Sequence, residues 1–319
     1  MAVLPRIVCL DSAPADDSDM DWSPIERLGS LTLHRSTTAT DVAGRLDGAT
    51  IALTNKVRID EAVLAACPSL RMIGVLATGF DVVDVRAAKA HGVVVCNVPG
   101  YATASTAQLA IHLLLELAWG VGRHDAAVHE GAWSRSSTFA WWQRPLVELD
   151  GKTLVVVGRG AIGGRVAAIA EALGMKVIAA AVPGAPARPD RVPLDEALAL
   201  ADAVSLHCPL TEATRGLMSA DRLALMRPTA WLVNTARGAV VDEQAIRCAL
   251  DQGTLGGYAT DVLSSEPPPP DHVLLGAPRC IITPHTGWAT REARARLLAT
   301  TAGNIEAFLS GAPTHVVNP

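Results

Sequence analysis

A glycine-rich turn in the middle of the chain is the first feature with the residues for specific chemistry. Residues 153–167 read TLVVVGRGAIGGRVA, in which Gly158, Gly160 and Gly163 follow a run of apolar residues and precede an alanine-rich segment. Glycines at these places permit a tight turn, close approach of backbone to phosphate, and close packing of helix on strand. The exposed N–H groups and the positive end of the next helix attract negative charge. We interpret the turn as a dinucleotide pyrophosphate site rather than an ordinary glycine-rich turn.

Three polar stretches further along the chain contain residue types that can carry a reaction. Each follows a predicted strand on its carboxyl side, where open α/β sheets bind their ligands. They are residues 234–238 (NTARG), 261–267 (DVLSSEP) and 284–288 (PHTGW). Each stretch alone is a modest signal, and the order of the three behind a mid-chain dinucleotide turn is far more specific.

At this point the sequence resembles the D-isomer-specific 2-hydroxyacid dehydrogenases, and the resemblance covers nearly the whole chain. In that family the active site consists of an arginine in an N-x-[AS]-R-G stretch, a glutamate before a proline and a histidine after a proline. The matching residues are Arg237, Glu266 and His285. The resemblance implies an NAD(P)-dependent oxidoreductase that acts on the CH–OH group and interconverts a small 2-oxo acid and a D-2-hydroxy acid.

The chemistry of such a reaction asks for the same three residue types. The planar fork of Arg237 can hold a carboxylate bidentately, and His285 can give or take a proton near neutral pH. A carboxylate at Glu266 beside the imidazole would orient the ring and favour its charged form. Taken singly, the three residues also fit a helix-start ion pair, a loop histidine and a solvated glutamate, but jointly they favour catalysis.

The resemblance also implies contacts with substrate and cofactor. Ala77, Thr78 and Gly79 match the loop whose backbone N–H groups bind the substrate carboxylate, with a structural turn as the competing interpretation. Thr103 is expected near the nicotinamide, Asp261 at its carboxamide, and residues 207–209 beside the adenosine. Cys208 is interpreted as a packing residue, because nothing nearby would activate its thiol. The full set of implied cofactor residues is Thr103, Gly158, Arg159, Gly160, Ala161, Ile162, Gly163, Ala181, His207, Cys208, Pro209, Thr235, Ala236, Asp261 and His285.

One position departs from the pattern of the NAD-preferring members. Those members usually end the second strand of the cofactor domain with an aspartate that accepts hydrogen bonds from the ribose hydroxyls. Here Ala181 stands in that place, so no acid repels a 2′-phosphate, and Arg159, or Arg188 and Arg191, can supply positive charge. We therefore hypothesise that NADP(H) is accepted at least as well as NAD(H).

Within the family, four stretches look most like the glycerate dehydrogenase and hydroxypyruvate (glyoxylate) reductase branch: residues 53–56 (LTNK), 76–80 (LATGF), 133–136 (WSRS) and 288–293 (WATREA). An alternative of a different class is a nucleotide-sensing, corepressor-like binding protein on the same scaffold. Because the family is usually dimeric through its cofactor domain, a homodimer is expected. Trp133, Trp141 and Trp142 are then either interface residues or core residues, and the sequence does not choose between them.

Composition limits the other possibilities. A net charge of −5 gives no basic footprint for nucleic acid, and the six cysteines form no C-x-x-C pair that would suggest a zinc site or a disulfide framework. Pro5, Arg6 and Asp11 interrupt the apolar residues too early for a signal peptide, and no later segment is apolar for long enough to span a bilayer. We expect a cytoplasmic protein with no metal, no membrane contact and no nucleic-acid partner.

The elements that must position these residues alternate between strand and helix. Residues 7–10, 51–53, 72–76 and 93–96 read as buried strands, residues 105–121 as a buried helix, and residues 291–309 as an amphipathic surface helix that crosses back to the first domain. A second block of strands is predicted at residues 153–157, 176–180, 203–206, 230–233, 257–259 and 280–283. The run 266–270 (EPPPP) must be an extended loop, because successive prolines forbid helix.

The predicted fold class is α/β, with two doubly wound parallel-sheet domains. Length favours two domains, since 319 residues exceed an ordinary single core. A flavodoxin-like substrate domain is expected from residues 1–101 and 291–319. A Rossmann NAD(P)-binding domain, residues 102–290, is expected to be inserted in it.

Overall fold

The computed structural model describes residues 4–16 and 18–319, and the chain divides into two compact units. The first unit contains the residues up to Ala102 together with Trp288–Pro319. The second unit is Thr103–Gly287. The chain therefore leaves the first unit once and returns to it near its end.

The first unit is built on a parallel sheet of five strands in the order β2-β1-β3-β4-β5. Alternate residues of β1 face opposite sides of the sheet: Ile7 and Cys9 join one apolar cluster, and Val8 joins the other. Both faces are therefore covered, as expected of a parallel sheet. The strands are β1 (Arg6–Cys9), β2 (Ser30–Leu33), β3 (Ile51–Thr54), β4 (Met72–Val75) and β5 (Val94–Cys96).

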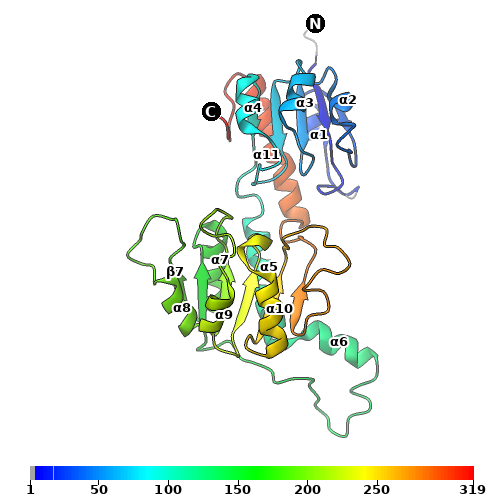
Figure 1. Ribbon diagram of the computed structural model, residues 1–319. Helices are drawn as coiled ribbons and strands as arrows, with labels where there is room; N and C mark the ends of the chain where they lie inside the picture. Colours follow the sequence, from blue (N-terminus) through cyan, green and yellow to red (C-terminus); the bar gives the residue numbers. More distant parts are fainter. Residues whose placement is uncertain (1–3, 17) are drawn as a thin grey trace. The chain divides into compact units, whose positions relative to one another are not determined.

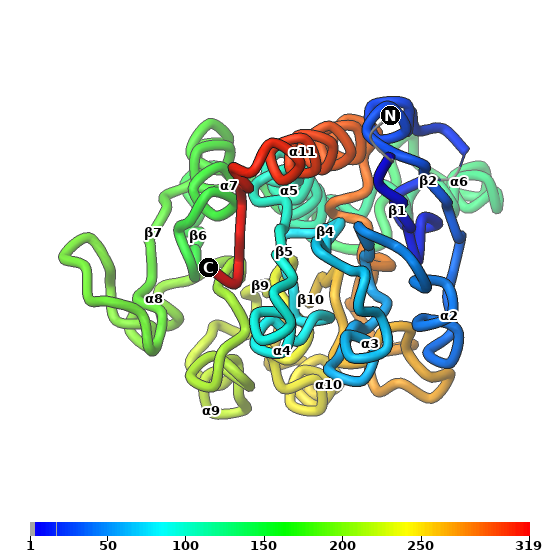
Figure 2. Tube along the Cα trace, turned by 90° about the horizontal axis from the view of Figure 1, so that it is seen from above, coloured from blue at the N-terminus to red at the C-terminus, as the bar shows by residue number. Residues whose placement is uncertain are grey.

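Two sets of helices cover this sheet. Helices α1 (Ser23–Glu26) and α11 (Arg291–Leu309) contribute to one apolar cluster, and α2 (Val42–Leu46), α3 (Glu61–Ala66) and α4 (Val85–Ala90) contribute to the other. Figure 2 shows α11 on one side of the first sheet and α2, α3 and α4 on the opposite side. Helix α11 has the predicted bounds, but it is not confined to the surface, because Leu297, Leu298 and Ile305 are buried in the core of the first unit.

The second unit has a parallel sheet of six strands in the order β11-β10-β9-β8-β6-β7. Helices α5 (Thr103–Trp119) and α7 (Ala161–Ala172) cover one face. The opposite face is covered by α8 (Leu194–Leu200), α9 (Ala220–Leu225) and α10 (Glu243–Gln252) (Figure 1). The strands are β6 (Thr153–Val157), β7 (Lys176–Ala180), β8 (Ala203–Leu206), β9 (Trp231–Asn234), β10 (Gly257–Thr260) and β11 (Cys280–Ile282).

The register of this second sheet aligns the carboxyl ends of its strands. Val157 pairs with Ala180 and Leu206, and Leu206 pairs with Asn234. Asn234 pairs in turn with Thr260, and Thr260 with Ile282. The loops after these strands therefore leave the sheet along one edge. Strand β6 lies between β7 and β8, so the order in which strands are added to the sheet reverses at β6. Open α/β sheets bind ligands at such a point.

Helix α5 is a core helix of the second unit. It begins two residues earlier than predicted and ends at Trp119, and its leucines join the cluster formed with α7 and the sheet. Across the described residues, no single helix is long and apolar enough to cross a membrane. Only α5 and α6 (Val121–His129) taken together pass such a test of length and composition, and that pair is bent by 57°.

The segment around α6 extends away from the sheet of its own unit (Figure 1). Trp133 and Trp142 in this segment are 51% and 58% exposed, and Phe139 between them is 92% exposed. The interpretation of Trp133 and Trp142 as core residues is therefore wrong for the chain as described. Trp141 is half-buried and lies edge-on against His124 of α6, with ring centroids 6.0 Å apart.

Candidate active site

The glycine turn after β6 has the geometry of an anion cradle. Gly158 has a φ of 95°, and a Cβ there would lie 2.6 Å from the backbone of His207 and Cys208. A Cβ on Gly163 would lie 2.1 Å from the carbonyl oxygen of Gly158. A Cβ on Gly160, the N-cap of α7, would meet nothing within 4 Å. A side chain at Gly158 or Gly163 would therefore clash with the protein's own backbone. Gly160 leaves open space at the N-terminus of α7, which fits a pyrophosphate.

The residues around this turn set its charge. Arg159 is exposed, with its guanidinium 4.0 Å from the Glu171 carboxylate, and Ala161 and Ile162 form the first turn of α7. Ala181 directly follows β7 and donates its N–H to the Val192 carbonyl at 2.8 Å. The end of β7 therefore presents no carboxylate at position 181.

The loop after β8 carries a largely buried histidine. Nε2 of His207 lies 2.8 Å from the Ser205 hydroxyl, and Nδ1 lies 3.5 Å from the Thr235 hydroxyl. Burial lowers the pKa of His207 from 6.5 to about 4, so the ring is neutral at physiological pH. Burial also raises the pKa of the Cys208 thiol to about 11, which agrees with the prediction that Cys208 packs rather than reacts. Pro209 continues this loop as an exposed residue.

Asn234 shapes the turn that carries Arg237. Its amide donates to the Arg237 carbonyl at 2.9 Å and accepts from the N–H of Ala236 at 3.0 Å. Arg237 is exposed, and one of its guanidinium nitrogens donates to the Ala236 carbonyl at 2.8 Å. Because a guanidinium has five N–H donors, it keeps others for an anionic ligand. Thr235 and Ala236 are both 9% exposed and lie at the carboxyl end of β9.

Glu266 and His285 form a direct pair although 19 residues separate them. The Glu266 Oε2 lies 2.6 Å from Nδ1 of His285, and the two side chains are 32% and 29% exposed. The other Glu266 oxygen accepts the N–H of Leu263 at 2.8 Å. His285 has a φ of 54°, a left-handed conformation that few residues without a special constraint adopt. The structure thus brings together two of the three residues predicted to carry the chemistry.

Asp261 anchors the turn that carries His285. Its buried carboxylate accepts the Thr283 hydroxyl at 2.6 Å, the N–H of Thr286 at 2.9 Å and the N–H of Gly287 at 2.7 Å. A carboxylate has about four acceptor positions, so one remains for a cofactor amide. The first turn of α5, which begins at Thr103, reaches the same turn, since the Ser105 hydroxyl donates to the Gly287 carbonyl at 2.6 Å.

The predicted substrate loop belongs to the first unit, directly after β4. The Thr78 hydroxyl donates to the Val98 carbonyl at 2.9 Å, and the Thr78 carbonyl accepts from the Asn97 amide at 2.7 Å. The Ala77 carbonyl accepts the N–H of Val98 at 3.0 Å. Within the described residues these bonds use the carbonyls and the hydroxyl of the loop, so the N–H groups of residues 77–79 remain for a ligand.

Polar residues at strand ends position the loops of this edge, and of these only Asn234 stands in a stretch that the sequence singles out. Ser205, Asn234 and Thr260 are buried and stand at or next to the carboxyl ends of otherwise apolar strands. Their hydroxyl and amide groups bind the neighbouring loops, as Thr260 does by donating to the Val262 carbonyl at 2.6 Å. A buried polar residue must find a hydrogen-bond partner. Polar residues closing apolar strands are therefore the sequence signal that points to this edge.

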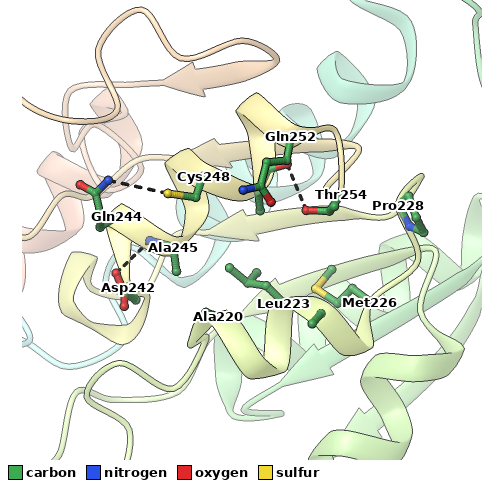
Figure 3. A pocket seen from close by; sticks show the side chains of 12 residues that line it. Ala220, Leu223, Met226, Pro228, Asp242, Gln244, Ala245, Cys248, Gln252 and Thr254 are labelled. Carbon is green, nitrogen blue, oxygen red and sulfur yellow. Dashed lines mark hydrogen bonds between the residues drawn. The ribbon is translucent and has the colours of Figure 1, made fainter.

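The second unit also contains an apolar groove at a different place. A groove of about 590 Å³ lies between α9 and α10, and Leu223, Met226 and Cys248 are among its mostly apolar lining residues (Figure 3). None of the candidate residues lines it. Over the described part of the chain, no group of three or more histidine, cysteine or acidic side chains is arranged to hold a metal ion.

Known proteins resemble this chain over nearly its full length. The family profile for the D-isomer specific 2-hydroxyacid dehydrogenase, NAD binding domain, matches residues 111–287. A hydroxypyruvate reductase from Blautia hydrogenotrophica is 42% identical over 98% of this chain and 99% of its own. A glycerate dehydrogenase from Methylorubrum extorquens is 40% identical over 88% of this chain and 89% of its own. The solved NADPH-dependent glyoxylate/hydroxypyruvate reductase from Sinorhizobium meliloti, in complex with NADP and malonate, is 28% identical, with a TM-score of 0.83 over 98% of this chain and 97% of its own.

Proposed function

The chain belongs to the D-isomer specific 2-hydroxyacid dehydrogenase family, and we propose that it is an NAD(P)-dependent oxidoreductase that interconverts a small 2-oxo acid and the corresponding D-2-hydroxy acid. The observation that carries this proposal is the His285–Glu266 pair. The loops that bear these two residues leave the second sheet at the same edge as the glycine turn. An acid/base group and a dinucleotide site in one unit are what such a reaction requires.

The cofactor would be held by the glycine turn and the loops that follow it along the sheet edge. Gly158, Gly160 and Gly163 with the N-terminus of α7 would bind the pyrophosphate, and Asp261 would accept a hydrogen bond from the carboxamide. When bound, the nicotinamide supplies or accepts the hydride.

His285 is proposed to hold and move the proton. Glu266 occupies Nδ1, so Nε2 is the nitrogen that can donate to the carbonyl oxygen of a 2-oxo acid, or accept the hydroxyl proton in the reverse direction. The carboxylate fixes the orientation of the ring, as an orienting acid does in other acid/base pairs. Glu266 is itself fixed by the N–H of Leu263, so the ring is held by a chain of two hydrogen bonds.

Arg237 is proposed to bind the substrate carboxylate with its guanidinium, because that planar fork matches a carboxylate in two parallel hydrogen bonds. In the first unit, the N–H groups of residues 77–79 are proposed as donors to a substrate carboxylate.

Substitution of His285 tests the proposal most directly. His285→Ala removes the proton carrier, so kcat should fall by about 10²- to 10⁴-fold, while the dissociation constant of the reduced cofactor stays unchanged. His129→Ala is the matched control, since its side chain is 80% exposed on α6. Turnover of His285→Ala close to that of the unchanged protein would remove the acid/base role.

We further propose that hydroxypyruvate and glyoxylate are the substrates to try first, because relatives that span almost the whole chain carry those names. A panel of hydroxypyruvate, glyoxylate, pyruvate and bulkier 2-oxo acids with each reduced cofactor measures the order of preference. A nucleotide-sensing binding protein would turn over none of them efficiently. The named relatives do not favour that alternative.

For the cofactor, we propose that NADP(H) is accepted at least as well as NAD(H). Ala181 places no carboxylate beside the 2′ position, and Arg159 and Arg188 are exposed cations of the same unit. Arg191 contributes less, because its guanidinium lies 2.7 Å from the Asp190 carboxylate. Comparison of kcat/KM for NADPH and NADH decides the question, and a strong preference for NADH would contradict the proposal.

A homodimer is proposed on the exposed apolar residues around α6. Trp119, Val121 and Leu146 are 49%, 64% and 41% exposed, in addition to the tryptophans and Phe139 of the same segment. So much apolar surface on one segment favours burial against a partner, and a second copy is the simplest partner. Light scattering measures the mass in solution, and a monomeric mass at micromolar concentration would remove the proposal.

We also propose that the protein works in the cytoplasm. All six cysteines are free thiols, which fits a reducing compartment. Fractionation of the source cells with an antibody to the protein tests this, and recovery outside the cytoplasmic fraction would contradict it.

A further inference from the structure

Glu243 is a largely buried carboxylate in a place where a glutamate normally faces solvent. It is the first residue of α10, behind the N-cap Asp242, and an acid in the first helical turn is usually explained by the helix dipole. Its side chain is only 10% exposed. The position alone therefore does not account for Glu243.

The Glu243 carboxylate holds two residues of the loop that carries Glu266. One oxygen accepts the N–H of Ser264 at 2.8 Å, and the other accepts the Ser264 hydroxyl. The same second oxygen lies 3.2 Å from Nε2 of His272, whose side chain is 6% exposed. Ser264 and His272 stand on either side of Glu266, so Glu243 fastens both arms of the loop.

This loop needs an external anchor because of its sequence. Residues 264–270 form no helix or strand, and Pro267–Pro270 supply no N–H groups for hydrogen bonds within the loop. Glu266 itself is held by the N–H of Leu263, the residue directly before Ser264. Whatever fixes Leu263 and Ser264 therefore also fixes Glu266.

A second contact ties the same loop to the segment that bears Arg237. Gly238 is the first residue of the short 3-10 helix η1 (Gly238–Val240), and α10 follows. A Cβ on Gly238 would lie 1.9 Å from the Leu263 carbonyl carbon and 2.2 Å from the Ser264 nitrogen. The two backbones are thus in direct contact at Gly238, and Glu243 binds the same Ser264 five residues further along.

We infer that Glu243 is a positioning residue for the reaction, acting through Ser264 and His272 on Glu266 and hence on the orientation of His285. This inference rests on the proposed function. Its chemistry is a carboxylate that satisfies the donors of a loop without secondary structure, which holds Glu266 within hydrogen-bonding distance of Nδ1 of His285.

The test is a double-mutant cycle between Glu243 and Glu266, with Gln244→Ala as the control because Gln244 is the exposed neighbour of Glu243 on α10. Glu243→Ala should lower kcat by about 10- to 100-fold, since small misplacements of catalytic groups have effects of this size. The dissociation constant of NADPH should change less than twofold, because the glycine turn lies at a different strand. Glu243→Gln keeps one acceptor for the N–H of Ser264, so it should retain more activity than Glu243→Ala.

The cycle separates positioning from a general loss of structure. If Glu243 acts through Glu266, Glu243→Ala added to Glu266→Gln should lower kcat by less than a further twofold. Multiplicative losses in the two variants, or turnover of Glu243→Ala equal to that of the unchanged protein, would overturn the inference. If Glu243→Ala does not fold, the same comparison is made with Glu243→Gln, whose shape is nearly identical.

Hydrogen exchange gives a readout that does not need cofactor or turnover. The amides of Leu263 and Ser264 donate to Glu266 and Glu243, so both should exchange faster in Glu243→Ala and at the original rate in Gln244→Ala. Unchanged exchange would refute the idea that Glu243 holds this loop. Faster exchange in a protein that reduces no 2-oxo acid with either cofactor would support the role of Glu243 in holding the loop and would reject the proposed function.

Discussion

His207 allows a quantitative prediction about acid stability. Burial lowers the pKa of its imidazole from 6.5 to about 4. Between pH 6.5 and about pH 4 the imidazole is protonated in the unfolded chain but neutral in the folded protein. The free energy of unfolding therefore falls as the pH falls through this range. The stability due to the neutral ring is fully present above pH 6.5. From these two pKa values the loss is about 2 kcal/mol at pH 5 and about 3 kcal/mol at pH 4.

The variant that isolates this effect is His207→Gln. Glutamine can still bond to the hydroxyls of Ser205 and Thr235 but does not titrate, so its own destabilisation should be independent of pH. Urea unfolding followed by circular dichroism at pH 7, 6 and 5 gives the free energy of unfolding of each protein. Between pH 7 and pH 5 the variant should lose about 2 kcal/mol less than the unchanged protein.

A control histidine makes the comparison specific. His129 has a side chain that is 80% exposed, so His129→Gln should follow the unchanged protein at every pH. Stability curves of His207→Gln and the unchanged protein that run parallel from pH 7 to pH 5 would refute the reasoning, because they would mean that His207 is protonated in the folded state as readily as in the unfolded chain.

Three further substitutions test other parts of the site. Gly163→Ala forces a Cβ to within 2.1 Å of the Gly158 carbonyl oxygen and should cost about 3 kcal/mol or more in urea unfolding, whereas Gly164→Ala, with nothing within 4 Å, should gain up to about 1 kcal/mol. Equal free energies of unfolding for Gly163→Ala and Gly164→Ala would contradict the close packing at Gly163. Arg237→Ala should raise KM for the 2-oxo acid and lower kcat in steady-state assays, and an unchanged KM would remove its carboxylate role. Asp11 accepts the N–H groups of residues 55–57, and Asn55 donates to the Leu76 carbonyl at 2.6 Å, directly before the substrate loop. Asp11→Asn keeps only one of the two accepting oxygens, so it should raise that KM with the NADPH dissociation constant unchanged by fluorescence titration, and the opposite pattern would count against it.

The second unit was the easier of the two to predict from sequence. Strand β6 has the predicted bounds because residues 154–157 are an unbroken run of buried apolar side chains, which alternate between the two apolar clusters on either face of the sheet. Strand β2, Ser30–Leu33, was missed for the opposite reason. It is an edge strand with mostly exposed residues, and its pairing with β1 supplies the structure that its own sequence does not indicate.

The candidate site divides in the same way. Arg237, Glu266 and His285 were found because each stands in a short motif next to a predicted strand, and the contact between Glu266 and His285 agrees with their expected partnership. Glu243 and His272 carry no such motif. In sequence Glu243 reads as an ordinary acid at a helix start, and only the packing of α10 against the loop places it beside residues 21 and 29 positions away. Contacts of this kind depend on the fold and cannot be read from local spacing.

Carboxylates, rather than helices or strands, fix the positions of the two segments that bear His285 and Glu266. The turn with His285 and the loop with Glu266 contain no helix or strand, so their backbone N–H groups need partners from elsewhere. Asp261 accepts from two N–H groups and a hydroxyl of the first segment, and Glu243 does the equivalent for Ser264 in the second. An ionised carboxylate suits this task because it accepts several hydrogen bonds at once, and each is stronger than a bond between neutral groups. The left-handed backbone of His285 persists in this setting because Thr283, Thr286 and Gly287 are all bound to one buried group.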